Sequence, residues 1–90
     1  MAETALRVTV HGRVQGVFYR DWTVRNAHEL GLAGWVRNVQ DGTVEALLQG
    51  PEREVQAMIE RMHEGPPAAG VECIEQSTCV AETLAGFTCR

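Results

Sequence analysis

The sequence predicts an α+β fold in which two helices cover one face of an antiparallel sheet. Three observations favour it: segments in which apolar and polar residues alternate, two segments with apolar residues at helical spacing, and the order of these segments along the chain. A chain of 90 residues is long enough for a modest core of two packed layers but too short for a second domain. We therefore expect residues 1–90 to form a single domain.

The first strand and the first helix are predicted on either side of a long connection. Leu6, Val8 and Val10 alternate with polar residues, as in a strand that packs one face on a core. Helical spacing follows over about residues 18–30, and Gly31 supplies the usual helix stop.

A β-hairpin is predicted after this helix. Segments 32–38 and 43–50 both alternate in polarity, and Asp41-Gly42 lies between them. This dipeptide is a strong hairpin signal because both residues tolerate a left-handed backbone.

The second helix is predicted over residues 51–64. Pro51 is a favoured first helical residue, and one apolar stripe continues through the segment until Gly65. The stripe consists of Val55, Met58, Ile59 and Met62. A strand at 71–75 and a short last strand at about 86–90 complete the order βαββαβ plus a terminal strand. Two split βαβ units in this order predict a ferredoxin-like sandwich, with both helices on one face of an antiparallel sheet.

Composition narrows the classes of partner. The net charge of −4 argues against wide nucleic-acid or anionic-membrane surfaces, and no apolar run approaches a membrane span. The first ten residues lack a secretory signal, so we expect a cytoplasmic protein. Cys73, Cys79 and Cys89 have neither metal-site nor disulfide spacing, and we expect them to be buried small hydrophobes.

The connection between the first strand and the first helix is typical of an anion site. It reads GRVQGVFYR over residues 12–20, and it leads from a strand into a helix N-terminus. Glycines allow main-chain N–H groups to converge on an anion, the helix dipole adds positive charge, and Arg20 can close the other side. The spacing matches neither a Walker A loop nor the dinucleotide fingerprint. By spacing alone, an ordinary turn that packs Val14, Val17 and Phe18 on the core is equally compatible.

Two motifs resemble the acylphosphatase family. Residues 12–20 are similar to its signature loop, and GWVRN at residues 34–38, followed by Asp41-Gly42, is similar to its second signature. The resemblance covers the whole chain, since the length and the βαββαβ order also agree, and it is weakest from residue 66 to residue 90. It implies metal-independent hydrolysis of acyl phosphates to a carboxylate and inorganic phosphate.

The resemblance also implies a role for each matching residue. Main-chain N–H groups of the signature loop, together with the Arg20 side chain, would bind the substrate phosphate, and Asn38 would orient the attacking water. The loop residues concerned are Gln15, Gly16, Val17, Phe18, Tyr19 and Arg20. No cofactor and no metal are expected, inorganic phosphate is expected as product or inhibitor, and the protein is expected to be a monomer. The ending Phe87-Thr88-Cys89-Arg90 lacks the further aromatic residue of many relatives, which leaves the role of the C-terminus open.

Several residues near the two motifs are expected to lie in the core or on the surface. His11 is the one candidate base beside the loop and is otherwise a surface histidine. Trp35 and Phe18 are expected in the core. Asp21 suits the helix dipole but would compete with a bound phosphate, so we expect its side chain to point away.

The main alternative is a non-catalytic ferredoxin-like domain that binds or senses a small molecule, because fold alone does not fix function. An RNA-recognition module needs paired aromatic residues that segment 43–50 lacks, and a metal carrier of this fold needs a C-x-x-C loop that is absent. A related domain also occurs inside larger carbamoyl-transfer proteins, an arrangement that the length of this chain disfavours.

Overall fold

The computed structural model describes residues 3–90, and its elements follow the predicted order. No helix in this part of the chain is long and apolar enough to cross a membrane. The strands and helices are β1 (Glu3–Arg13), α1 (Tyr19–Glu29), β2 (Ala33–Asn38), β3 (Val44–Pro51), α2 (Glu52–Glu64), β4 (Gly70–Thr78) and β5 (Phe87–Cys89).

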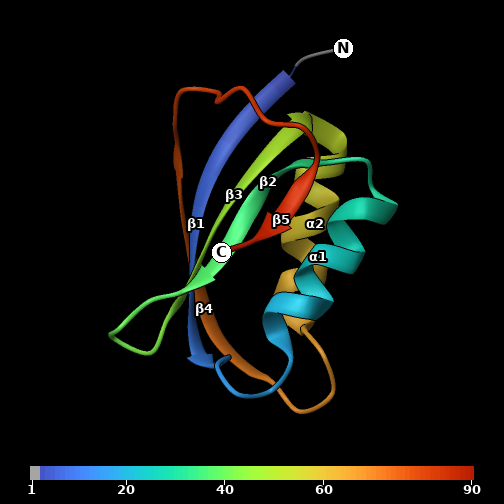
Figure 1. Ribbon diagram of the computed structural model, residues 1–90. Coiled ribbons are helices and arrows are strands. Elements are labelled where there is room, and N and C mark those ends of the chain that lie inside the picture. The colour runs from blue at the N-terminus through green and yellow to red at the C-terminus, as the bar shows by residue number, and fades with distance from the viewer. Residues whose placement is uncertain (1–2) are drawn as a thin grey trace.

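The five strands form one sheet in the order β4-β1-β3-β2-β5, and both helices lie against the same face of it (Figure 1). This confirms the ferredoxin-like prediction. The pairs among the first four strands are antiparallel, whereas β5 pairs in parallel with β2, so the sheet is mixed at this edge. The reason is that the chain leaves β4 at one edge and enters β5 at the other edge in the direction of β2.

The main core lies between the sheet and the helices. Val8 and Val10 of β1 are fully buried there, as the alternation predicted. The α2 side of the core is formed by the predicted apolar stripe, Val55, Met58, Ile59 and Met62.

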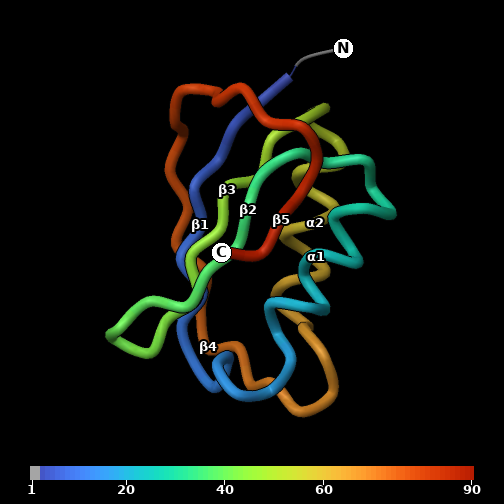
Figure 2. Tube along the Cα trace, in the orientation of Figure 1, coloured from blue at the N-terminus to red at the C-terminus, as the bar shows by residue number. Residues whose placement is uncertain are grey.

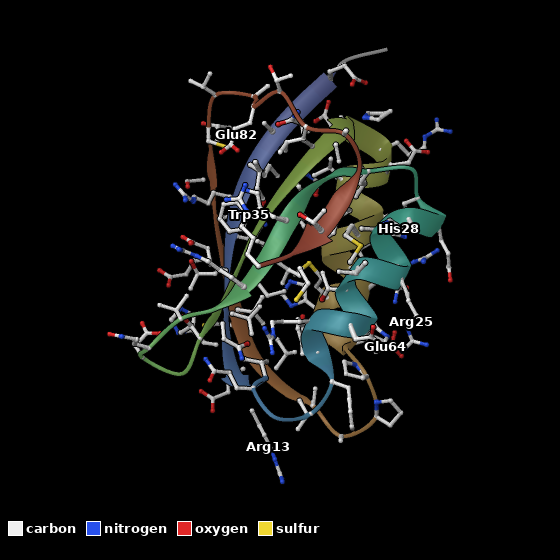
Figure 3. The ribbon with its side chains drawn as sticks, in the orientation of Figure 1. Arg13, Arg25, His28, Trp35, Glu64 and Glu82 are labelled. Carbon is white, nitrogen blue, oxygen red and sulfur yellow. The ribbon has the colours of Figure 1, made fainter. Side chains whose placement is uncertain are left out.

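The opposite face of the sheet has a second, smaller core. Ala5, Trp35 and Leu47 are buried there, with Cys79 and Leu84 packed against them. The segment between β4 and β5 crosses over this end of the sheet from one edge to the other (Figure 2). Figure 3 shows Trp35 on the face away from the helices. The prediction that Trp35 is a core residue is therefore confirmed, although it belongs to this second core.

Hydrogen bonds hold the crossing segment on the sheet. Gln49 Nε2 donates to the Glu82 carbonyl at 2.7 Å, and the Glu82 amide donates back to Gln49 Oε1 at 2.9 Å. The amide of Gly34 donates to the Gly86 carbonyl at 3.0 Å just before β5 begins. The segment of residues 79–86 is thus held at its middle and at its end, which places β5 beside β2.

Gly12 lies at a β-bulge where β1 and β4 approach each other closely. The pairing of β1 with β4 shifts register between His11 and Gly12, where φ of Gly12 is 124°. A Cβ at this position would lie 2.2 Å from the Gly70 carbonyl oxygen. Only glycine allows the two backbones to approach so closely, and the bulge then directs the chain out of the sheet into the following loop.

The cysteine prediction was wrong. Cys73 and Cys89 are exposed and Cys79 is partly exposed, all three as free thiols. Cys73 and Cys89 lie on the two edge strands of the sheet, each of which has a neighbouring strand on one side only. Their apolar character therefore did not bury them.

Candidate active site

The sheet topology brings three chain segments to one place. β1 and β2 both run antiparallel to β3, and β5 runs parallel to β2. The C-terminal ends of β1, β2 and β5 therefore point toward the same end of the sheet (Figure 1). The loop after β1, Asn38 at the end of β2 and Cys89 at the end of β5 meet there, although they lie far apart in the sequence.

Residues 14–18 form a loop that is anchored by apolar side chains in the main core. Val14 and Val17 are buried in the main core, as is Tyr19 at the start of α1. Gly16 and Phe18 have left-handed backbones, with φ of 73° and 64°. Alternation of this kind turns successive N–H groups toward one side, which is the geometry of an anion-binding nest.

The N–H groups of this loop remain available for a ligand. Within residues 3–90, none of the main-chain N–H groups of residues 15–20 donates a hydrogen bond to the protein. Two of them also belong to the first turn of α1, which begins at Tyr19 and contributes the positive end of its dipole. Such N–H groups are commonly satisfied by an anion.

Arg20 and Asn38 line the same cavity. Its volume is about 430 Å³, and Gly16 of the loop also contributes to its wall. Arg20 forms no ion pair with any carboxylate of the described residues, and its Nη1 donates to the main-chain oxygen of Arg90 at 3.5 Å. Asn38 is exposed, and its side-chain amide has no hydrogen-bond partner within residues 3–90. The Asn38 amide and the remaining N–H groups of the Arg20 guanidinium are therefore available to a ligand between them.

The Gln15 side chain links the loop to the β2–β3 hairpin. Its Nε2 donates to the carbonyl oxygens of Val39 at 2.7 Å and Thr43 at 2.8 Å. Val39 and Thr43 are the ends of the hairpin loop, and the Val39 amide also donates to the Thr43 carbonyl at 2.9 Å. Because Asn38 directly precedes Val39, Gln15 sets the distance between the N–H groups of the loop and the Asn38 amide.

The tip of the hairpin is closed by Asp41. Its Oδ1 accepts a hydrogen bond from the Thr43 hydroxyl at 2.6 Å and one from the Thr43 amide at 3.0 Å. These bonds, the hydroxyl first, lower the pKa of Asp41. Gly42 follows with φ of 93°, so the turn predicted at Asp41-Gly42 is confirmed.

Tyr19 has a structural contact of its own. Its hydroxyl donates to the Met62 carbonyl at 2.7 Å, near the C-terminal end of α2. Burial raises the pKa of Tyr19 far above its ordinary value of 10.0. The phenol is thus neutral and hydrogen-bonded to α2.

Of the other polar residues singled out in the sequence, His11 and Arg13 lie outside the cavity, whereas Asp21 lies at its edge. His11 Nε2 pairs with Glu75 on the sheet face opposite the helices. Asp21 pairs with Arg25 one turn along α1, at 3.4 Å, and its residue forms part of the cavity edge. Figure 3 shows the Arg13 side chain extending away from the fold.

One sequence expectation fails at the site. Phe18 is 81% exposed, where a core position was expected, because its left-handed backbone turns the side chain outward between buried Val17 and Tyr19. The role of the C-terminus was left open by the sequence, and the structure shows that Cys89 lines the cavity and that the Arg90 main-chain oxygen contacts Arg20. No local signal marks this contribution, because it depends on pairing with β2.

Metal ligands are not gathered at the cavity. Within residues 3–90, no group of three or more histidine, cysteine, aspartate or glutamate side chains is arranged to hold a metal ion. The cavity instead offers one guanidinium, one amide and the main-chain N–H groups of the loop. These donors suit an oxyanion.

The fold defines a ferredoxin-like α+β domain, and comparison with known proteins identifies its family. The acylphosphatase family model matches residues 6–89. An acylphosphatase of Rhodospirillum rubrum is 52% identical over 83 residues, which are 92% of this chain and 91% of that protein. The chain belongs to the acylphosphatase family.

Solved structures agree with this assignment. An acylphosphatase from Coxiella burnetii superposes with a TM-score of 0.94 at 40% identity, covering 98% of this chain and 93% of the other. The acylphosphatase from Bacillus subtilis superposes with a TM-score of 0.92 at 37% identity, covering 96% of this chain and 97% of the other. The chain is accordingly a hydrolase that acts on acyl phosphates, and the non-catalytic regulatory alternative is not favoured.

Proposed function

We propose that the N–H groups of residues 15–20 and the Arg20 side chain hold the phosphoryl group while Asn38 orients the attacking water. The observation that carries this proposal is the shared cavity, in which Arg20 and Asn38 lie with the open side of the loop. The two side chains come from separate elements that only the sheet brings together.

One guanidinium, one amide and the N–H groups of the loop are sufficient for the hydrolysis of a mixed anhydride. Attack of water on phosphorus forms one P–O bond and breaks the bond to the acyl oxygen, whose electron pair leaves with a stable carboxylate. The demanding part is to hold a dianion and a water in line while charge redistributes on the phosphoryl oxygens. One preorganised donor is typically worth about 10²- to 10³-fold in rate, and the loop offers several.

The proton of the water goes to the substrate in this proposal. An amide accepts a hydrogen bond but no proton at neutral pH, so Asn38 orients the water without deprotonating it. His11, the one base that the sequence offered near the loop, is paired with Glu75 on the other face of the sheet. A phosphoryl oxygen is then the nearest acceptor, and the products are the carboxylate and inorganic phosphate.

The remaining expectations are part of the proposal and stay predictions. We propose a single-domain, monomeric, cytoplasmic enzyme that needs no metal or other cofactor and binds no nucleic acid. Inorganic phosphate is expected to be a competitive inhibitor, because the loop recognises the anion and not the acyl group.

Substitution of the two side chains tests their roles. Arg20→Ala should raise the inhibition constant of phosphate and lower turnover, and Arg20→Lys should restore little because it lacks the planar fork of donors. Asn38→Ala should keep near-parental phosphate inhibition while kcat falls by about 10²-fold, as expected of an interaction that acts chiefly in the transition state. Acetyl phosphate hydrolysis, measured with a chelator present and at several phosphate concentrations, gives both kcat and the inhibition constant of phosphate.

Matched controls are available on the same molecule. Arg53 is exposed on α2 and Gln40 is exposed in the hairpin, so Arg53→Ala and Gln40→Ala should retain parental kinetics. Circular dichroism must show that every variant is folded. Parental turnover in folded Asn38→Ala would refute the water-positioning role, and loss of activity on chelation that a divalent cation restores would refute metal independence.

A further inference from the structure

The cavity is larger than its phosphate end requires. Its volume of about 430 Å³ lies within the range of sites for small organic ligands. A phosphoryl group held by the loop and Arg20 fills only a part of that volume. The remaining wall therefore faces the rest of the substrate, which is the acyl group.

The remaining wall is largely apolar. Phe18, Val24 and Cys89 line it, from the loop, from α1 and from the end of β5. Of the described residues, only Phe18 and Val80 are large hydrophobics with strongly exposed side chains, at 81% and 88%. Val80 lies outside the cavity, and single exposed apolar residues of that kind are ordinary. Phe18 differs because its exposed ring belongs to the wall of the site.

The backbone of Phe18 supports a functional reading of this exposure. Its φ of 64° is the one left-handed angle at a non-glycine residue among the described residues. Such a conformation is costly for a bulky side chain and is found preferentially at ligand sites. It directs the ring outward to the cavity, while Val17 and Tyr19 on either side remain buried.

Charge at the cavity edge adds a second selective feature. Arg20 is the one cation among the lining residues, and the phosphoryl group occupies it. Asp21 is also a lining residue, and the ion pair of its carboxylate with Arg25 is solvent-exposed and therefore weak. A second carboxylate on the acyl group would face Asp21 with no partner of its own.

We propose that Phe18, Val24 and Cys89 form an acyl subsite that selects uncharged, apolar and preferably aromatic acyl groups, with Asp21 disfavouring acyl groups that carry a further negative charge. The subsite rests on the proposed function, since it assumes that the phosphoryl group occupies the loop and Arg20. It makes the cavity a specificity site as well as a catalytic one.

Three substrates of the same reaction test the subsite: acetyl phosphate, benzoyl phosphate and 4-carboxybenzoyl phosphate. Each kcat/KM is divided by the uncatalysed hydrolysis rate of that substrate, which removes differences in intrinsic reactivity. The parent should prefer benzoyl over acetyl phosphate and should disfavour the 4-carboxy compound.

Variants of the lining residues should change these preferences. Phe18→Asn, in which asparagine tolerates the left-handed backbone, should lower the benzoyl-to-acetyl ratio about 5- to 10-fold, and Val24→Ala should lower it about 3-fold. Asp21→Asn should raise the 4-carboxybenzoyl-to-benzoyl ratio about 5-fold.

Two variants control for unrelated effects of the same substitutions. Val80→Asn removes the other exposed hydrophobic, and Glu29→Gln neutralises a carboxylate on the same helix as Asp21, so both should keep the parental ratios. Parental ratios in folded Phe18→Asn and Val24→Ala would overturn the subsite while leaving the hydrolytic function standing. Failure of the parent to hydrolyse acetyl phosphate would overturn the proposed function and the subsite together.

Discussion

The loop of residues 14–18 and the hairpin loop of residues 39–43 supply the two halves of the site, and they are held in opposite ways. The first is anchored by buried side chains, Val14 and Val17, that belong to the main core. The hairpin loop projects from the sheet and is held by hydrogen bonds, from Gln15 to its two ends and from Thr43 to Asp41.

Because of this difference, substitutions in the two halves of the site should have different effects on phosphate binding and turnover. Apolar burial fixes the loop without using its N–H groups, which leaves them for the anion. A polar tether fixes the hairpin through a few bonds, each worth about 0.5–1.5 kcal/mol net. Damage to the loop should therefore affect phosphate binding and turnover together, whereas damage to the tether should affect turnover alone.

The largest effect is expected from glycine substitutions that test the backbone of each half. Gly16→Ala and Gly42→Ala both place a Cβ on a left-handed residue with no protein atom within 4 Å, so backbone strain of roughly 1–2 kcal/mol is the shared cost. Gly16→Ala should also move loop N–H groups and raise the inhibition constant of phosphate about 10-fold or more, with a comparable loss of turnover. Gly42→Ala should leave phosphate inhibition within about twofold of the parent. Inhibition kinetics and thermal unfolding measure both effects, and equal phosphate inhibition in the two variants would contradict the anion-binding role of the loop.

An intermediate effect is expected from removal of the tether. Gln15→Leu loses both hydrogen bonds to the hairpin, so Asn38 is held less firmly and kcat should fall about 10-fold, with phosphate inhibition within about twofold of the parent. Gln49→Leu is the matched control, since Gln49 also makes two side-chain bonds to the main chain, at Glu82 on the other side of the sheet. It should lose similar stability and keep kcat. A parental kcat in Gln15→Leu would show that the hairpin needs no tether.

The smallest effect is expected at Tyr19, the anchor that joins the start of α1 to α2. Tyr19→Phe should lower the free energy of unfolding by about 1–2 kcal/mol, because the Met62 carbonyl loses its partner. Burial raises the pKa of Tyr19, so its contribution to stability is complete below the ordinary pKa of 10.0 and declines as pH rises above it, where the unfolded chain ionises first. Tyr19 is the one tyrosine of the chain, so ultraviolet titration of the folded and denatured protein reports it alone. Equal titration of the two states would contradict the buried hydrogen bond.

Much of the fold was predictable because its signals are local. The α2 stripe, the β1 alternation and the Asp41-Gly42 turn each depend on residues a few positions apart, and all three are confirmed. The family resemblance located Arg20 and Asn38, and the structure brings these two residues to one cavity. Their catalytic roles stay predictions until the variants are measured.

Other features were predicted wrongly or missed because their causes are not local. Phe18 has an apolar side chain of the kind found in cores, yet its left-handed backbone exposes the ring. The cysteines look like buried hydrophobes, yet two of them fall on the edge strands. Trp35 is buried as expected, but the layer that buries it is the segment between β4 and β5, which carries no regular pattern of its own.

The sequence by itself determined the elements, their order and the two motifs that mark the chemistry, because hydrophobic periodicity and turn residues act over short distances. The tertiary structure alone decided that Arg20, Asn38 and the end of β5 share one cavity, because this depends on β1, β2 and β5 running in the same direction in the sheet. It also decided that the Gln15 side chain binds the hairpin, 24 and 28 residues further along the chain, and that an exposed aromatic ring completes the cavity wall. Strand pairing joins residues that no local signal connects, and for that reason the substrate-facing surface emerged only with the folded chain.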